Sequence, residues 1–236
     1  MANEAYKKKA AEAAVELVET GMTLGLGTGS TAAHFIAAVG AKFSGGGSIA
    51  CVVTSEATRR AAQDAGLRVV EPDETTQLDL AVDGADEIGP DGALIKGGGG
   101  ALMREKIVAQ SAARFVVIAD DTKLVRHLGA FALPVEIEPA LFGLTVAAVR
   151  RALAACGYDR PNIALRRAAD GTGPYLTDGG RYILDAALVR IDEPALLDDA
   201  LRAIAGVTET GLFVGLATDC IVAGPKGVRR IPVKTP

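Results

Sequence analysis

The sequence predicts an α/β fold: a Rossmann-like, mostly parallel sheet with helices on both faces, followed by a smaller ferredoxin-like α+β domain. Two observations support this prediction. Helical and strand patterns alternate as far as Leu133-Pro134, which is typical of a parallel sheet, and the order then becomes strand, helix, strand, strand, helix, strand. With 236 residues, 49% of them hydrophobic, the chain is long enough to bury a sizeable core.

In the first part of the chain, glycine and proline residues mark the boundaries between apolar strands and amphipathic helices. An opening helix is expected to run to about Glu19, and the later helices are expected at Ser30–Val39, Ala57–Ala65 and Ala101–Ala112. The expected strands are Thr23–Gly27, Ile49–Thr54, Arg68–Glu71, Leu78–Val82, Leu94–Lys96 and the strongly apolar Phe115–Ala119.

The second part carries the ferredoxin-like order of elements. Its expected strands are Val135–Ile137, Asn162–Arg166, Arg181–Ile191 and Val207–Leu212, and its expected helices are Thr145–Ala155 and Pro194–Ile204. The apolar stretches Phe213–Ala217 and Cys220–Ala223 precede a C-terminal segment rich in proline, glycine and basic residues, which is expected to return to the first sheet. We therefore expect a catalytic Rossmann-like domain of residues 1–133 with 213–236, and a ferredoxin-like domain of residues 134–212.

Composition and charge exclude several classes of function. The net charge of −4 and the scattered basic residues give no footprint for nucleic acid, and no run of eighteen apolar residues or signal-peptide pattern predicts a membrane or export, so we expect a cytoplasmic protein. Three distant cysteines and two distant histidines do not have the spacing of metal ligands or of a disulfide framework. Acid–base chemistry should therefore fall to carboxylates and lysines.

The first candidate site is the glycine turn Gly25–Thr31 between a strand and a helix. Backbone N–H groups and the helix dipole can hold a phosphate there, with hydroxyls beside them. The spacing Gly27-x-Gly29-x-x-Ala32, with Glu56 after the next strand, also fits the loose dinucleotide pattern. An ordinary tight turn is the third interpretation.

Further candidates follow later strands. Asp83-Gly84-Ala85-Asp86-Glu87 follows the strand Leu78–Val82, at the carboxyl end where open α/β sheets bind ligands, although a solvated turn would have a similar composition. Lys96-Gly97-Gly98-Gly99-Gly100 ends another strand and lets the backbone approach a ligand, with a flexible linker as the alternative.

Two single residues complete the set. Glu105 begins the following helix and either faces the same crevice or forms a surface pair, and Lys123 follows the strand Phe115–Ala119. A phosphate cradle, clustered aspartates, two lysines and a glutamate at one rim suit proton transfer beside a carbonyl.

These motifs resemble one known family. Gly-Thr-Gly-Ser-Thr at 27–31, Asp-Gly-Ala-Asp-Glu at 83–87, Lys-Gly-Gly-Gly at 96–99 and Arg-Glu-Lys at 104–106 resemble type A ribose-5-phosphate isomerases. The resemblance covers essentially the whole chain, because Ile118–Asp120, Leu133–Glu136, Ile183–Asp185 and Gly211–Phe213 also look like the family in order and spacing. The loop Thr54–Thr58 matches only loosely. Lys7, on the opening helix, is interpreted as a solvated surface lysine.

The resemblance implies an aldose–ketose isomerase that interconverts ribose 5-phosphate and ribulose 5-phosphate through a cis-enediolate, in the non-oxidative branch of the pentose phosphate pathway. It implies Glu105 as the proton acceptor, with Asp83, Asp86 and Lys96 handling ring opening, the hydroxyl protons and the developing oxyanion. It implies no metal and no cofactor, and a homodimer or homotetramer. The implied substrate-binding residues are Thr28, Gly29, Ser30, Thr31, Asp83, Gly84, Ala85, Asp86, Lys96, Gly97, Gly98, Gly99 and Lys123.

Alternative functions remain open at this point. Another sugar-phosphate enzyme of the same superfamily, a deaminase or lactonase, would share the fold. A noncatalytic sugar-phosphate sensor would share the binding loops, but it would not require Glu105, and the chain has no spare length for a regulatory helix-turn-helix segment.

Overall fold

The computed structural model describes residues 2–43 and 49–233 of the chain, which form two compact units. The first unit consists of residues 1–85, 104–123 and 215–236, and the second of residues 86–103 and 124–214. The second unit is larger than the expected ferredoxin-like domain, since residues 86–103 and 124–133 also belong to it. The domain boundaries at 133/134 and 212/213 stay a prediction.

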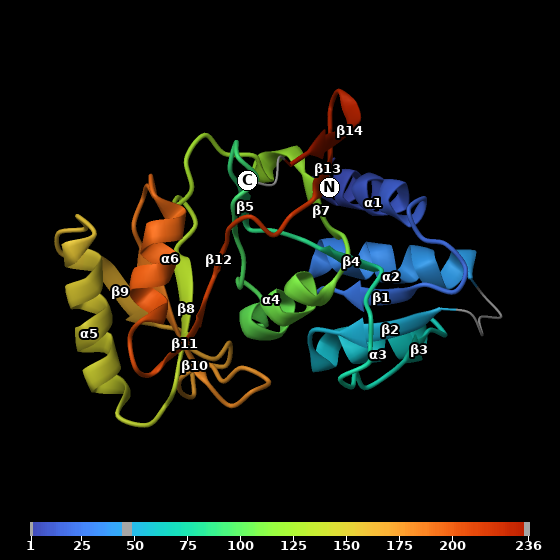
Figure 1. The fold of residues 1–236 in the computed structure, drawn as a ribbon. Helices are drawn as coiled ribbons and strands as arrows, with labels where there is room; N and C mark the ends of the chain where they lie inside the picture. Colours follow the sequence, from blue (N-terminus) through green and yellow to red (C-terminus); the bar gives the residue numbers. More distant parts are fainter. Residues whose placement is uncertain (1, 44–48, 234–236) are drawn as a thin grey trace. The chain divides into compact units, whose positions relative to one another are not determined.

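The first unit is built on a seven-stranded sheet with the order β14-β13-β7-β4-β1-β2-β3 (Figure 1). All neighbouring strands are parallel except β14, which pairs antiparallel with β13. The strands are β1 (Thr23–Leu26), β2 (Ala50–Val53), β3 (Arg68–Val69), β4 (Leu80–Asp83), β7 (Phe115–Asp120), β13 (Asp219–Gly224) and β14 (Gly227–Pro232). The C-terminal return to this sheet is therefore confirmed.

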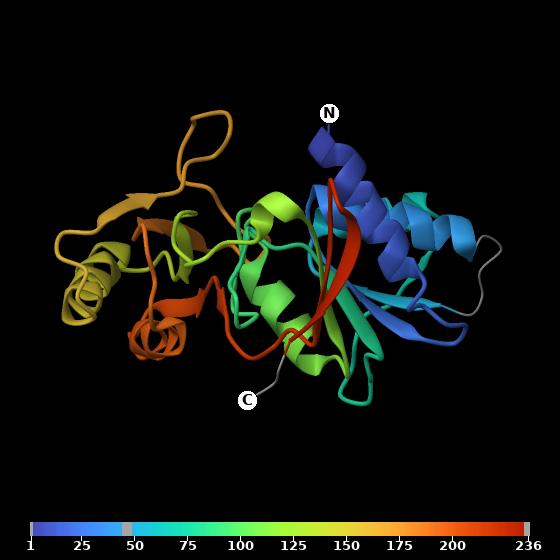
Figure 2. The same ribbon diagram turned by 90° about the horizontal axis from the view of Figure 1, so that it is seen from above.

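Helices cover both faces of this sheet, as Figure 2 shows for α1 and α2 on one side and α4 on the other. The residues of β1 explain the arrangement, because successive side chains in a strand point to opposite faces. Leu24 and Leu26 join the apolar core under α1, α2 and α3. Gly25 faces the other way, where a Cβ atom would lie 2.4 Å from Cγ1 of Val108 in α4. The helices are α1 (Ala2–Val15), α2 (Ser30–Lys42), α3 (Glu56–Asp64) and α4 (Leu102–Ser111).

The second unit contains the expected order of strand, helix, strand, strand, helix, strand. Its four-stranded sheet is antiparallel with the order β11-β8-β10-β9, and one hydrophobic core joins the sheet to α5 and α6. The elements are β8 (Leu133–Ile137), α5 (Phe142–Ala155), β9 (Asn162–Leu165), β10 (Tyr182–Ala187), α6 (Pro194–Arg202) and β11 (Val207–Thr210).

A second, three-stranded sheet in this unit carries the glycine-rich loop. Its antiparallel strands are β12 (Leu212–Phe213), β6 (Leu94–Ile95) and β5 (Glu87–Ile88), in that order. The strand β5 has only two residues and was not expected from the sequence. Because β6 is the central strand, the loop that begins at Lys96 starts from a buried and paired segment.

Several expected segments were longer than the strands that form. The strand expected over Arg181–Ile191 ends at Ala187, because the chain turns at Val189, whose φ of 67° is incompatible with an extended strand. Phe213 forms the end of β12, but the stretch expected to continue to Ala217 does so only as a loop, with Gly215 at φ 67°. Apolar composition alone did not reveal these turns.

The two buried cysteines should be far less reactive than the exposed one. Cys51 and Cys220 are buried in the first unit, and burial raises their pKa values to about 12 and about 11, while Cys156 is exposed. A raised pKa means that almost no thiolate forms near pH 8, and the thiolate is the reactive species.

We therefore expect one thiol per chain to react rapidly with a disulfide reagent at pH 8, and all three to react in denaturant. Replacing Cys156 with serine should abolish the rapid phase. A rapid phase that survives in this variant would contradict the burial of Cys51 or Cys220.

Candidate functional site

Three loops with predicted site residues lie at the same edge of the parallel sheet. Thr28–Thr31 follow β1, Asp83 ends β4, and Lys123 ends the short 3-10 helix η1 (Asp121–Lys123) after β7. These strands are neighbours in the order β7-β4-β1, and all three run parallel, so their carboxyl ends share one edge. The chain leaves β1 towards β2 and returns to β4 on the other side, which makes this the switch point where such sheets bind ligands.

Asp83 is held against the first of these loops. Its side chain is only 3% exposed, and its Oδ1 accepts hydrogen bonds from the backbone N–H groups of Thr28, at 3.1 Å, and Gly84, at 2.7 Å. A Cβ atom on Gly27 would lie 2.0 Å from the carboxyl carbon of Asp83. Glycine at position 27 is therefore required by the carboxylate that packs over it.

A cluster of hydroxyl groups also supports the loop that follows β1. The Oγ1 of Thr28 lies 2.8 Å from Oγ1 of Thr54, 3.0 Å from Oγ of Ser55 and 3.0 Å from Oγ1 of Thr58. Thr58 and Thr54 in turn donate to the carbonyl oxygens of residues 27 and 26, at 2.9 and 3.0 Å. The loosely matching segment 54–58 thus supports the turn. Ser55, three residues before Thr58 at the start of α3, is a recognisable N-cap signal.

The opening helix also reaches this edge. Lys7 Nζ donates to Ser30 Oγ at 2.9 Å, and the same ammonium group is 2.9 Å from Oε1 of Glu4. Ser30 is the first residue of α2, where backbone N–H groups and the helix dipole favour an anion. Lys7, interpreted from the sequence as a solvated lysine, is thus hydrogen-bonded to the first residue of α2.

Glu105 lies in the first turn of α4, which leads the chain back into β7. Its side chain is only 4% exposed, so the alternative of a surface ion pair is excluded. Because α4 connects to the start of a parallel strand, its first turn lies towards the carboxyl edge of the sheet. The N-terminal end of a helix favours a carboxylate.

Asp86, Lys96 and Gly97–Gly99 belong to the second unit, whereas Gly84 and Ala85 belong to the first. Asp86 Oδ2 accepts a hydrogen bond from the N–H group of Gly98 at 2.8 Å, and a Cβ atom on Gly98 would lie 2.6 Å from Asp86 Oδ1. Lys96 is buried, and its Nζ lies 5.5 Å from the centre of the Phe213 ring, a cation–π distance. Asp86 and the glycine-rich loop are thus brought together.

Glu87, the third carboxylate of the motif Asp83–Glu87, has a structural role. Glu87 is buried in β5, and its two carboxylate oxygens accept hydrogen bonds from the N–H groups of Gly129, at 2.7 Å, and Phe131, at 2.6 Å. It therefore anchors the loop before β8. This arrangement separates Glu87 from the chemistry that we assign to Asp83 and Asp86.

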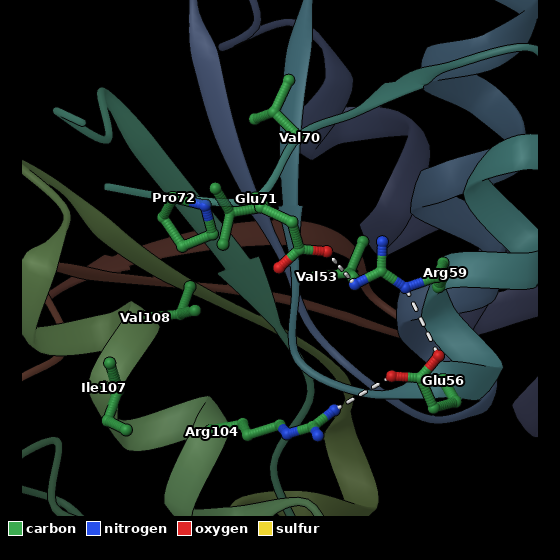
Figure 3. Close-up of a pocket in the computed structure, with 10 residues that line it drawn as sticks. Val53, Glu56, Arg59, Val70, Glu71, Pro72, Arg104, Ile107 and Val108 are labelled. Carbon is green, nitrogen blue, oxygen red and sulfur yellow. Dashed lines mark hydrogen bonds and ion pairs between the residues drawn. The ribbon is translucent and has the colours of Figure 1, made fainter.

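The first unit has a cavity of about 350 Å³ between α3 and α4 (Figure 3). Figure 3 shows that its charged side chains pair with one another: Arg104 with Glu56 at 3.3 Å, and Arg59 with both Glu56, at 3.3 Å, and Glu71, at 2.6 Å. None of the predicted site residues lines it. Its ion pairs connect α3 to α4 beside Glu105.

Across residues 2–43 and 49–233, no three His, Cys, Asp or Glu side chains are grouped so that they could hold a metal ion. Within the same residues, no helix has the length and apolar character needed to span a membrane.

Comparison with known proteins gives one consistent result. The family model for ribose 5-phosphate isomerase A (phosphoriboisomerase A) matches residues 50–227. The chain belongs to the ribose 5-phosphate isomerase A family. A relative named ribose-5-phosphate isomerase A from Rhodopseudomonas palustris is 49% identical over 231 residues, covering 98% of this chain and 99% of the relative. One from Bradyrhizobium diazoefficiens is 50% identical over 233 residues, covering 98% and 96%.

Solved structures of the family have the same fold. A D-ribose-5-phosphate isomerase in complex with phospho-erythronic acid gives a TM-score of 0.90 at 36% identity and covers 98% of this chain and 100% of its own. The isomerase from Plasmodium falciparum gives a TM-score of 0.91 at 28% identity, covering 98% and 99%. The predicted α/β, Rossmann-like fold is therefore confirmed, as is the resemblance on which it partly rested.

The contact between Gly27 and Asp83 can be tested by substitution. Gly27→Ala places a methyl group inside the space of the Asp83 carboxylate, so we expect the free energy of unfolding to fall by about 1–3 kcal/mol, the usual effect of overpacking. Urea denaturation would measure the change.

Gly143→Ala is the matched control, because Gly143 lies in α5 with no atom within 4 Å of its Cβ position. A helical Gly→Ala change should raise stability by up to about 1 kcal/mol. Equal stability of the Gly27 variant and wild type would show that the Asp83 carboxylate does not pack as described.

Proposed function

We propose that this chain catalyses the interconversion of ribose 5-phosphate and ribulose 5-phosphate. The observation that carries the proposal is its membership of the ribose 5-phosphate isomerase A family over nearly its whole length. The position of Asp83 and the glycine turn at the switch point of the parallel sheet supports it, because a sugar phosphate needs both an anion site and nearby proton carriers.

The phosphate group would bind at the start of α2. Ser30 and Thr31 supply hydroxyls there, the first turn of the helix supplies N–H groups, and Lys7 supplies a positive charge 2.9 Å from Ser30 Oγ. Thr28 would contribute by shaping the turn, since its hydroxyl bonds to Thr54, Ser55 and Thr58 and its N–H group bonds to Asp83. Lys123, at the carboxyl end of the neighbouring strand β7, would add a second cation.

Glu105 would move the carbon-bound proton. After the sugar ring opens, its carboxylate takes the proton from carbon 2, and the electron pair forms the double bond of a cis-enediolate whose negative charge rests on the oxygen of carbon 1. A proton then passes from the oxygen of carbon 2 to that of carbon 1. Glu105 returns its proton to carbon 1, and the ketone forms at carbon 2.

Asp83, Asp86 and Lys96 would handle the protons and charge on oxygen. Asp83 would assist ring opening by taking the hydroxyl proton of carbon 1, while the ring oxygen is protonated. Asp86 with Lys96 would carry the hydroxyl protons and stabilise the developing oxyanion, together with the amides of the 97–99 loop.

The proposed site combines the predicted site residues with Lys7. The catalytic residues are Glu105, Asp83, Asp86 and Lys96, and the binding residues are Lys7, Thr28, Gly29, Ser30, Thr31, Gly84, Ala85, Gly97, Gly98, Gly99 and Lys123. We also propose a homodimer or homotetramer and a cytoplasmic location. The family match favours an isomerase over a deaminase, a lactonase or a sensor.

The ligand of one solved relative suggests a probe. Phospho-erythronic acid, bound in that relative, combines a phosphate with a planar carboxylate that resembles an enediolate in shape and charge. We expect this chain to bind it as well, because an enzyme binds mimics of its intermediate tightly.

The role of Glu105 can be tested with Glu105→Gln, a nearly isosteric change that removes the base. We expect wild type to isomerise ribose 5-phosphate in chelator-treated buffer and the variant to lose about 10²–10⁴ in kcat, the contribution of a general base. Binding of the sugar phosphate, measured by calorimetry, should persist.

Glu74→Gln, a change at an exposed loop position, is the control and should keep full activity. An inactive wild type would overturn the proposed function. If the Glu105 variant turned over at the wild-type rate, Glu105 would not be the base, but the isomerase function would stand. Asp83 or Asp86 would then be the next candidate for the base.

The contribution of Lys7 is expected mainly in binding. Lys7→Met removes a charged hydrogen-bond donor worth about 1.5–3 kcal/mol, so KM for ribose 5-phosphate should rise by about 10- to 100-fold with little change in kcat. Lys8→Met is the control, because Lys8 is the next residue of the same helix and points to Glu12 instead. Equal KM values for both variants would show that Lys7 does not contribute to substrate binding.

A further inference from the structure

Within the second unit, side-chain donors hold three consecutive carbonyl groups of the glycine-rich loop. Arg166 Nη1 donates to the carbonyl oxygen of Gly97 at 2.8 Å and to that of Gly98 at 3.2 Å. The hydroxyl of Tyr175 donates to the carbonyl oxygen of Gly99 at 3.3 Å. Arg166 and Tyr175 are outside every motif that pointed to the active site.

Arg166 is itself held firmly. Its Nε and Nη2 atoms donate to the two carboxylate oxygens of Asp185, at 2.9 and 2.5 Å, which is the bidentate geometry of strong arginine–carboxylate pairs. Asp185 lies on β10, which pairs with β9, and Arg166 directly follows β9. The guanidinium carbon also lies 5.9 Å from the centre of the Tyr175 ring. The guanidinium group therefore has a fixed position on the sheet.

Fixing the carbonyl groups also fixes the N–H groups. In a planar trans peptide the C=O of one residue and the N–H of the next point in opposite directions. Since the carbonyls of Gly97 and Gly98 face Arg166, the N–H groups of Gly98 and Gly99 face away from it. The N–H of Gly98 does so and donates to Asp86 at 2.8 Å.

The loop needs such support because of its composition. Four consecutive glycines have many accessible backbone conformations, and here Gly97 and Gly100 adopt φ values of 102° and 80°. Burial raises the pKa of Tyr175, so its hydroxyl stays protonated and remains a donor at neutral pH. A hydrogen bond from a guanidinium to a peptide carbonyl also polarises that peptide and strengthens its N–H as a donor.

We propose that Arg166, held by Asp185, is a positioning residue for the isomerisation: it orients the peptides of the 97–99 loop so that Asp86 and the loop amides meet the charge that develops on the sugar oxygens. The inference rests on the proposed isomerase function. It adds to that function a residue that does not touch the substrate and acts through the loop. Preorganised donors of this kind are effective because they need no rearrangement during the reaction.

The test is Arg166→Met, which keeps an unbranched side chain and removes its donors. We expect kcat to fall by about 10- to 100-fold and KM for ribose 5-phosphate to change by less than about threefold, since the phosphate is held elsewhere. Affinity for phospho-erythronic acid should fall by about the same factor as kcat/KM. Inhibition by inorganic phosphate, which reports the α2 site alone, should not change.

Arg150→Met is the matched control. Arg150 also donates to backbone carbonyl groups in the second unit, those of Pro161 and Ile163 at 3.3 and 3.5 Å, but not to the glycine-rich loop. The Arg150→Met variant should keep the wild-type ratio of affinities for phosphate and phospho-erythronic acid, even if its stability changes. Arg166→Lys should recover part of kcat, because an ammonium group can reach a carbonyl but cannot reproduce the bidentate pair.

The outcomes separate positioning from structural damage and from failure of the function. Equal losses of affinity for phosphate and phospho-erythronic acid, or an unchanged kcat, would overturn the positioning role. If Arg166→Met does not fold, Asp185→Asn applies the same readouts and should give a smaller loss in the same direction. An inactive wild type would overturn the proposed function instead, whereas the ratio of inhibitor affinities would still decide whether Arg166 positions the loop.

Discussion

The parallel pairing of β1 with β4 is the constraint on which the first unit depends. It brings the end of one strand so close to the next that residue 27 can have no side chain, and the Asp83 carboxylate takes that space. A buried carboxylate is unfavourable unless hydrogen-bond donors surround it. The N–H groups of Thr28 and Gly84 meet this need, and in doing so they fix the turn that begins α2. One contact thus fixes both a buried carboxylate and the turn at the start of α2.

Much of this arrangement was predictable because its signals are local. Short apolar runs separated by glycine turns indicate parallel strands, and residues after such strands meet at one edge, so Thr28–Thr31, Asp83 and Lys123 could be grouped from the sequence. Two kinds of feature were not predictable. Two-residue strands such as β5 have no periodicity and exist because a distant partner pairs with them. Lys7 meets Ser30 across two packed helices, 23 positions apart, and no local pattern encodes that contact.

Polar side chains hold the carbonyl groups of both glycine-rich turns, the one after β1 and the one after β6. Under the turn after β1 the supports are hydroxyls, which donate to the carbonyls of residues 26 and 27. Under the loop after β6 they are a guanidinium and a phenol, which donate to the carbonyls of residues 97–99. In each case protein side chains hold the carbonyl groups of the turn, and one of its N–H groups donates to a carboxylate: Thr28 to Asp83 and Gly98 to Asp86. The motif supplies the flexible backbone, and residues outside the motif give it one conformation.

The path of the chain has a consequence for its synthesis. The first unit is interrupted twice, after residues 85 and 123, and its strand β13 is made only after the whole of the second unit. Until then one edge of β7, six buried residues from Phe115 to Asp120, has no partner. Such an open apolar edge is a template for pairing with other chains. The ribosome therefore releases a protein whose central sheet closes last, and the cell must shield that edge for as long as residues 124–218 are being made.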